Sequence, residues 1–361
     1  MKKVLLMIGG QSIDYLADML WISMITDKSI ACESNFYPSF FFQKNLDKAW
    51  GKGFTLYGKV NEKHIRSNPT HQELRFLIQS NFYDYLIYPS IRRFDNLFVL
   101  ASKKMGKNRV IVIDGEDDKN ISWHSNHATY YKRELTDIAH AHGIKPISFF
   151  IPEIIIDEIK SKINFSSPKK HLLAPCDPRD RRTYIYRDEI SYFQQYRDAY
   201  FGYTMRKKGW DCLRHYEIIA AGSIPFFEDY ESIPEFTMFN YPKKLQKKAN
   251  DLYLKNLNNY RMPPEDLENY KNYQKEFENW LRENSLNFGS KGLKDQITNS
   301  ICKNSNINVG IFTLIKINFF SNYDYRKERN KSSHYFYKVV ILLKSIFSLI
   351  KNFRKKSKFK T

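Results

Sequence analysis

The sequence predicts an α/β fold of two domains that face a cleft, followed by a basic amphipathic tail. Three observations predict it: apolar runs alternate with helical patterns, a polar break (NFSSPKK) falls at 164–170, and basic residues gather at the end of the chain. The predicted domains cover 1–165 and 166–300, and the tail covers 301–361. A chain of 361 residues is long enough for two domains of ordinary size.

The composition fits a folded protein of a reducing compartment. Hydrophobic residues make up 42% of the chain and aromatic residues 16%, enough for a sizeable core. The four cysteines are scattered and form no C-x-x-C pair, which argues against a disulfide framework or a zinc module. The apolar start of the chain stops at Gly9 and Gly10, so it is interpreted as a buried first strand and not as a signal peptide.

In the first domain, the run KVLLMIG at 3–9 is a short apolar strand that ends in glycines. Apolar residues then follow at helical spacing, and Ser12 or Asp14 could cap that helix. The remaining predicted elements are a helix at 73–82, a strand at 83–90, a helix at 91–106, a strand at 108–118, a helix at 127–143 and a strand at 145–153.

In the second domain the same alternation resumes. The long helix that closes it, PPEDLENYKNYQKEFENWLRENS, carries proline in its first turn, where no backbone N–H is needed. The predicted elements are a strand at 171–178, a helix at 188–198, a strand at 199–204, a helix at 210–222, a strand at 223–228, a helix at 242–257 and a helix at 263–285. Open parallel sheets bind ligands beyond the carboxyl ends of their strands, so we expect a site in the cleft.

The stretch AYFGYTMRKKGWDCLRHYEIIAAGSIPFFEDYESIP at 199–234 carries the most specific signal. It combines a strand, a glycine-containing loop, a helix with Arg-x-x-Glu, an Ala-Gly-x-x-Pro turn and a buried strand. In this order the pieces resemble the donor-binding segment of GT-B glycosyltransferases, closest in style to exostosin-like and group 1 enzymes. The resemblance implies two Rossmann-like domains facing a cleft, with a nucleotide-sugar donor on the second domain.

Arg214 and Glu217 form the Arg-x-x-Glu of this segment. The guanidinium of Arg214, one turn into the helix, can bind phosphates bidentately, where the positive end of the helix dipole also favours anions. Glu217 lies on the same face at i+3, where it can accept hydrogen bonds from ribose hydroxyls. The alternative is a surface ion pair between the two side chains.

The neighbouring residues have smaller predicted roles. Gly209 would let the backbone approach the ligand, and Asp211 would either cap the helix or contact the ligand. His215 could face the donor, although packing under the loop is the favoured interpretation. Gly222 would end the helix and allow a tight turn. Two basic side chains could help to neutralise the diphosphate: Lys208 and Arg182.

One feature departs from the family pattern. Many retaining enzymes of this architecture carry two glutamates with seven residues between them, and the first would fall at Gly209. The departure favours the exostosin-like version and leaves inverting and retaining chemistry both open.

The acidic loop DGEDD at 114–118 follows a predicted strand and allows three interpretations. It could supply the general base for the acceptor hydroxyl, with Asp117 preferred and Glu116 as a further candidate. Asp14, at the mouth of the first strand, is the other preferred base. Alternatively, Glu116 and Asp118 resemble the metal-binding Asp-x-Asp of GT-A glycosyltransferases. The third interpretation is a solvated turn.

We expect no metal and no cofactor, because GT-B enzymes usually stabilise the leaving diphosphate with a helix dipole and basic residues.

The formal charge of +19 comes largely from the tail, where Glu328 is the only acid after Arg326. The rest of the chain carries no nucleic-acid-binding signature, so we expect no nucleic-acid partner. The tail alternates apolar stretches with lysines and holds no apolar run of the ~20 residues that span a bilayer. It is typical of an amphipathic helix on an anionic membrane surface, or of a helix docked on the protein itself.

The resulting hypothesis is a cytoplasmic, peripheral membrane glycosyltransferase acting on a glycan or lipid-linked acceptor in polysaccharide biosynthesis. Two alternatives remain: a metal-dependent GT-A-type glycosyltransferase that uses the DGEDD loop, and a non-catalytic membrane-surface binding protein.

Overall fold

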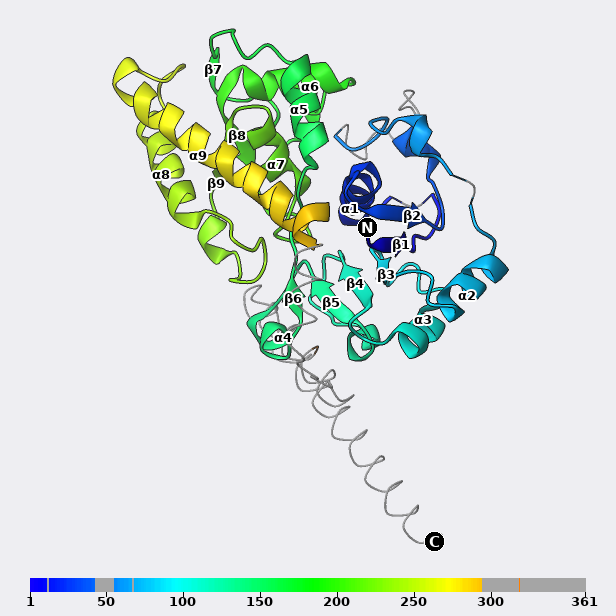
Figure 1. Cartoon of the computed structure of the whole chain (residues 1–361). Coiled ribbons are helices and arrows are strands. Elements are labelled where there is room, and N and C mark those ends of the chain that lie inside the picture. Colours follow the sequence, from blue (N-terminus) through cyan, green and yellow to red (C-terminus); the bar gives the residue numbers. More distant parts are fainter. Residues whose placement is uncertain (12, 43–54, 67, 294–317, 319–361) are drawn as a thin grey trace, which may run out of the picture.

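The computed structural model describes residues 1–11, 13–42, 55–66, 68–293 and 318, and the α/β fold class is confirmed (Figure 1). Within these residues the strands form two sheets. The N-terminal sheet has the order β2-β1-β3-β4-β5-β6 and the C-terminal sheet the order β7-β8-β9. All registered strand pairs are parallel. Apart from residue 318, the predicted tail lies outside the described residues, and in the described part no helix is long and apolar enough to cross a membrane.

The strands of the N-terminal sheet are buried on both faces, which is why they appear in the sequence as continuous apolar runs. In β1, for example, Val4 and Leu6 pack into one apolar cluster and Leu5 into another, which Met7 just after the strand also joins. The six strands are β1 (Lys3–Leu6), β2 (Ala31–Ser34), β3 (Tyr85–Tyr88), β4 (Val110–Asp114), β5 (Thr129–Lys132) and β6 (Lys145–Pro146).

Helices cover both faces of this sheet. Residues of α1 join the first cluster, and residues of α2, α3 and α4 join the second. Asp14 caps α1 by accepting a hydrogen bond from the backbone of Ala17, as predicted. The four helices are α1 (Tyr15–Thr26), α2 (His71–Gln79), α3 (Phe98–Met105) and α4 (Asp137–Ala141).

Apart from α5, the C-terminal sheet and its helices agree closely with the prediction. Its strands are β7 (His171–Leu173), β8 (Ala199–Thr204) and β9 (Ile224–Phe227). Its helices are α5 (Glu153–Lys162), α6 (Glu189–Arg197), α7 (Leu213–Ala220), α8 (Lys243–Lys255) and α9 (Pro264–Phe288).

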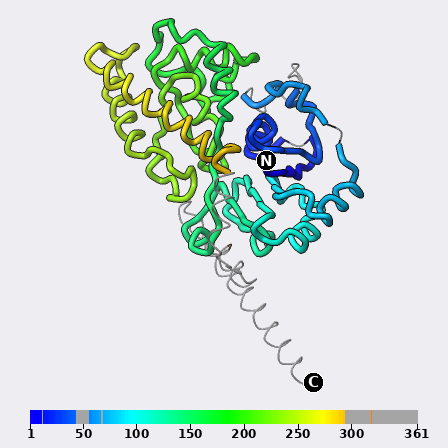
Figure 2. The backbone as a smooth tube through the Cα atoms, in the orientation of Figure 1, coloured from blue at the N-terminus to red at the C-terminus, as the bar shows by residue number. Residues whose placement is uncertain are grey.

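The two sheets share one apolar core, because the cluster around α1 continues into the residues of β8, α7 and α9. Figure 1 and the backbone tube in Figure 2 show α9 running obliquely across the helices of the C-terminal sheet and ending near α1. There the backbone N–H of Ser290 donates to the Ser23 hydroxyl at 2.9 Å, and the Ser290 hydroxyl donates to Asp27 at 2.7 Å. The chain thus returns to the N-terminal sheet after completing the C-terminal one.

Three predicted elements of the first domain are wrong in part. The predicted helix at 127–143 contains strand β5 and only the short α4, because Tyr130 and Tyr131 alternate between the two faces of the sheet. The predicted helix at 91–106 begins only at Phe98, since the preceding arginines turn toward the acidic loop. The predicted strand at 145–153 pairs only at Lys145–Pro146 and continues as the buried connection between the sheets.

Two elements were not predicted at all, β2 and α5. The predicted linker at 164–170 also proves to be tied into the fold. Lys169 in it is buried, and its ammonium donates to the carbonyl oxygens of Arg197, Ala199 and Gly222 at 2.7–3.0 Å.

Candidate active site

Arg214 lies in the first turn of α7, which follows β8 after the loop at 205–212. Its Nη1 donates to the hydroxyl of Tyr184 at 2.8 Å, and the guanidinium lies 4.9 Å from the centre of that ring. Its Nε is buried and has no hydrogen-bond partner in the described part of the chain. An arginine carries five N–H donors, and within the described residues the one side-chain partner of this guanidinium is Tyr184.

Glu217 is buried one turn further along α7, with 5% of its surface exposed. One carboxylate oxygen accepts from the hydroxyl of Tyr192 at 2.6 Å, and the other accepts from the hydroxyl of Thr55. Among the described residues Arg214 and Glu217 therefore do not form the ion pair of the alternative interpretation. A buried carboxylate without a cation is costly unless hydroxyls or amides satisfy it, as two hydroxyls do here.

The loop before α7 is held by the N-terminal sheet. A Cβ at Gly209 would collide with the carboxylate of Glu134, because that side chain packs directly against the glycine backbone. Glu134, just beyond β5, accepts hydrogen bonds from the backbone N–H groups of Trp210 and Asp211 at 3.1 and 3.2 Å. The predicted approach of Gly209 to a ligand is therefore replaced by an approach to Glu134.

Asp211 does not cap α7, which corrects the prediction. The N-cap residue is Cys212, and it makes no side-chain cap hydrogen bond. The buried carboxylate of Asp211 instead accepts from the backbone of Phe149 at 2.7 Å and from the hydroxyl of Tyr216 at 2.8 Å. Burial raises the pKa of Asp211 to about 6.

His215 is fully buried and packs under the loop, as favoured. Its Nε2 donates to the carbonyl oxygen of Trp210 at 2.9 Å, so its Nδ1 accepts from the hydroxyl of Thr204 at 2.8 Å. Burial lowers its pKa to about 4, which keeps the ring neutral. Because both nitrogens are used internally, His215 holds the loop in place and does not face a donor.

The other predicted donor contacts make no hydrogen bond or ion pair with Arg214 within the described residues. Gly222 adopts φ +76° and ends α7 at the opposite end of the helix, which confirms its structural role. The side chain of Arg182 is 90% exposed and pairs with Asp180 at 2.7 Å. Lys208 is exposed in the loop before α7.

In the N-terminal sheet, Asp14 lies where the strand order reverses. The chain passes from β1 to β2 on one side and then to β3 on the other, and such switch points bind ligands in open α/β sheets. The Asp14 carboxylate accepts from Ser90, beyond β3, at 2.6 Å and lies 3.7 Å from Arg93. Both its oxygens already accept hydrogen bonds, since Oδ1 caps α1.

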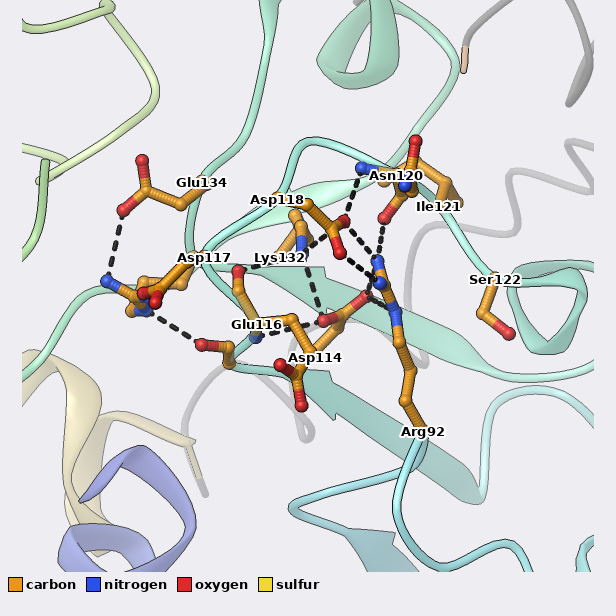
Figure 3. A network of polar contacts seen from close by, with 12 residues as sticks. Arg92, Asp114, Glu116, Asp117, Asp118, Asn120, Ile121, Ser122, Lys132 and Glu134 are labelled. Carbon is orange, nitrogen blue, oxygen red and sulfur yellow. Dashed lines mark hydrogen bonds and ion pairs between the residues drawn. The ribbon is translucent and has the colours of Figure 1, made fainter. Parts of the chain in front are cut away.

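The acidic loop is organised around Asp114, which is completely buried (Figure 3). Its carboxylate accepts from Lys132 at 2.9 Å, from Arg92 at 2.9 Å and from the hydroxyl of Tyr130 at 2.5 Å. Burial lowers the pKa of Lys132, and the adjacent Asp114 opposes that shift. The network joins the carboxyl ends of β4 and β5.

The three remaining carboxylates of the loop each have a basic partner. Arg93 donates to Glu116 at 2.8 Å, Arg92 donates to Asp118 at 2.7 and 2.9 Å, and Arg133 donates to Asp117. Glu116 and Asp118, the residues of the metal interpretation, are thus held by different arginines. Across the described residues no three His, Cys, Asp or Glu side chains are grouped closely enough to hold a metal ion.

Asp117 is the most accessible of the candidate bases, with 47% of its side chain exposed. Its partner Arg133 is buried and also donates to the carbonyl oxygen of Asp211 at 2.5 Å. Arg133 therefore links Asp117 to the loop that precedes α7. The carboxyl edges of the two sheets meet at this point.

The structure thus gathers Arg214 with Tyr184, Glu217 with Tyr192 and Thr55, and the Gly209 loop with Arg133 and Glu134. The partners in these sets were not predicted. The tyrosines of the stretch TYIYRDEISYF, which follow the basic loop, were the available signal for Tyr184 and Tyr192.

No protein-family model, no curated protein and no solved structure matches this chain. The function is therefore inferred from the geometry and chemistry of the described residues, together with the resemblance of the 199–234 segment.

Proposed function

We propose that the protein is a glycosyltransferase of GT-B architecture, which moves a sugar from a nucleotide-sugar donor to a glycan or lipid-linked acceptor. The observation that carries the proposal is the state of Arg214 and Glu217. They lie one turn apart on α7 beside the carboxyl end of β8, yet neither is in an ion pair within the described chain. In a structural Arg-x-x-Glu the two side chains would form an ion pair with each other. In a ligand-binding helix they stay unpaired and are free to bind a ligand.

In this mechanism the diphosphate of the donor binds Arg214, where the guanidinium and the N-terminus of α7 stabilise the charge that develops on the leaving group. Glu217 accepts hydrogen bonds from the ribose hydroxyls, which take the place of the hydroxyls it now binds. No metal is required for either role.

The acceptor hydroxyl approaches from the carboxyl edge of the N-terminal sheet, with Asp117 as the general base. Asp117 is preferred to Asp14 because it is accessible and one of its oxygens has no partner among the described residues. Asp14 then keeps α1 and the β3 loop in place through Ala17 and Ser90.

The test is calorimetric titration of the full chain with UDP, GDP, ADP and CMP, with Mn²⁺ or with EDTA. One nucleotide should bind in either medium, and Arg214→Ala should weaken that binding roughly 10- to 100-fold, the loss expected for charge-assisted hydrogen bonds to phosphate.

Arg282→Ala is the matched control, because Arg282 is half-exposed and pairs with Asp157 on the surface at 3.0 Å. Its nucleotide affinity should equal that of the wild type. Unchanged affinity in Arg214→Ala would remove the assignment of Arg214, and binding only with Mn²⁺ would favour the metal-dependent alternative.

A further inference from the structure

The loop between β7 and α6 carries Tyr184, and its two neighbouring arginine–aspartate pairs are formed within the loop. Asp177 pairs with Arg179 and Asp180 pairs with Arg182, each at 2.7 Å. Asp177 and Asp180 are therefore used by arginines of the same loop. Neither carboxylate contacts Arg214, whose hydrogen-bond partner among the described residues is the Tyr184 hydroxyl.

Tyr184 itself is unusually placed for a surface tyrosine. It is 40% exposed, yet its hydroxyl is fixed by Arg214 at 2.8 Å, and the ammonium of Lys207 lies 5.9 Å from the ring centre. Two cations therefore lie close to the ring, one from the loop before α7 and one from α7 itself. Two cations gathered at one aromatic ring without a carboxylate leave positive charge uncompensated.

The hydroxyl of Tyr184 accepts from Arg214, so its own proton is left to donate. Accepting a hydrogen bond from a cation polarises the O–H group and makes it a better donor. The guanidinium and the hydroxyl then present N–H and O–H donors side by side, at a separation that suits two oxygens of one phosphate group.

We propose that Tyr184 is a second anion-binding residue of the donor site, whose hydroxyl donates to the same diphosphate that Arg214 binds. The proposal rests on the proposed function and makes it more specific: the ligand is recognised as a nucleoside diphosphate through Arg214 and Tyr184 together, with Lys207 adding charge. Tyr184 binds and orients the phosphate and takes no part in proton transfer.

The test is Tyr184→Phe, which keeps the ring beside Arg214 and removes the hydroxyl alone. Calorimetric titrations of the full chain use inorganic pyrophosphate and the nucleoside diphosphate that the wild type binds. We expect both dissociation constants to rise about tenfold, as for the loss of one hydrogen bond to a charged group. Tyr260→Phe, at an exposed tyrosine that bonds His171, is the control and should change neither constant.

A double variant separates direct contact from an effect through Arg214. In the Arg214→Ala background, Tyr184→Phe should still weaken pyrophosphate binding, because the hydroxyl would have its own bond to the phosphate. No further loss in that background would overturn the direct contact, as would an unchanged affinity in Tyr184→Phe alone.

The same titrations distinguish the two levels of the proposal. If Arg214→Ala weakens nucleotide binding and Tyr184→Phe does not, the donor site stands and the role of Tyr184 fails. If pyrophosphate binds with dependence on Tyr184 but no nucleotide does, the anion site stands and the glycosyltransferase proposal fails. Absence of binding by both ligands would overturn both.

Discussion

Asp211 shows how a residue can belong to the conspicuous segment of a sequence and still serve the fold. Its carboxylate joins the backbone of Phe149, in the connection between the sheets, to the hydroxyl of Tyr216 on α7. Burial raises its pKa to about 6, whereas the unfolded chain would titrate this group near pH 4. The folded state therefore binds this proton more tightly than the unfolded state does.

The first prediction follows from that difference in proton binding. The stabilisation that Asp211 gives the folded state is fully present below about pH 4 and is lost as the pH rises through about 6. This should lower the unfolding free energy of the wild type by roughly 2–3 kcal/mol. Asp211→Asn does not titrate but can keep both hydrogen bonds, since its amide can donate to Tyr216 and its oxygen can accept from Phe149.

Urea denaturation at pH 4, 5, 6 and 7 measures this effect. The unfolding free energy of the wild type minus that of Asp211→Asn should fall across the series. Asp251→Asn, on the exposed side of α8, controls for removal of a carboxylate. A difference that stays flat with pH would contradict the prediction.

At the scale of elements, strand β5 depends on the acidic loop beside it. Lys132 is fully buried at the end of this strand, and its ammonium is satisfied by Asp114 at 2.9 Å and by the carbonyl oxygen of Glu116 at 3.1 Å. A charged residue can end a central strand only when such partners are in place. The loop is therefore part of the sheet and more than a solvated turn.

The second prediction compares two aspartates of this loop. Asp114→Ala leaves Lys132 and Arg92 without the shared carboxylate and should lower the unfolding free energy by about 3–5 kcal/mol. Asp118→Ala removes a pair whose carboxylate is 44% exposed and should cost about 1 kcal/mol or less. Thermal or urea denaturation of both variants checks this, and equal losses would contradict the buried network.

The sequence predicted the elements whose own patterns are strong. Strands β1, β3, β4, β8 and β9 are continuous apolar runs, and α8 and α9 have clear helical spacing with recognisable ends. Strand β5 was missed because TYYK, followed by Arg133 and Glu134, looks polar until Asp114 and Asp117 are known to be its partners. That pairing joins residues distant along the chain, which no local pattern reveals.

The site was predictable to a smaller extent. Arg214 and Glu217 were identified from their spacing, and Gly222 from its place at a helix end. The side chains that surround them come from other elements: Tyr184 from the loop after β7, Tyr192 from α6 and Thr55 from the N-terminal part of the chain. Only the tertiary fold brings these segments together.

At the scale of the whole molecule, the two sheets are connected by buried polar contacts as well as by the shared apolar core. Arg133 and Glu134, just beyond β5, form hydrogen bonds with the loop before α7. The backbone of Phe149 donates to Asp211 and accepts from Asn284 of α9. The geometry of the proposed donor site is therefore set partly by the N-terminal sheet.

The third prediction concerns this junction. Glu134→Ala frees the amides of Trp210 and Asp211 and removes one partner of the buried Arg133, which should cost about 3 kcal/mol of unfolding free energy. Hydrogen exchange should speed up in the loop before α7 and stay slow in β9. Glu153→Ala, at the exposed start of α5, should change neither. Slow exchange of the loop in Glu134→Ala would contradict the role of Glu134.

The contact of Thr55 with Glu217 ties the N-terminal part of the chain to the carboxylate that we propose holds the ribose. Lys59 makes a second contact from the N-terminal side, to Glu158 at 3.1 Å. If the ribose hydroxyls of the donor replace the hydroxyls that Glu217 now binds, donor binding breaks the Thr55 contact. The affinity for the donor would then depend on how firmly this contact is held.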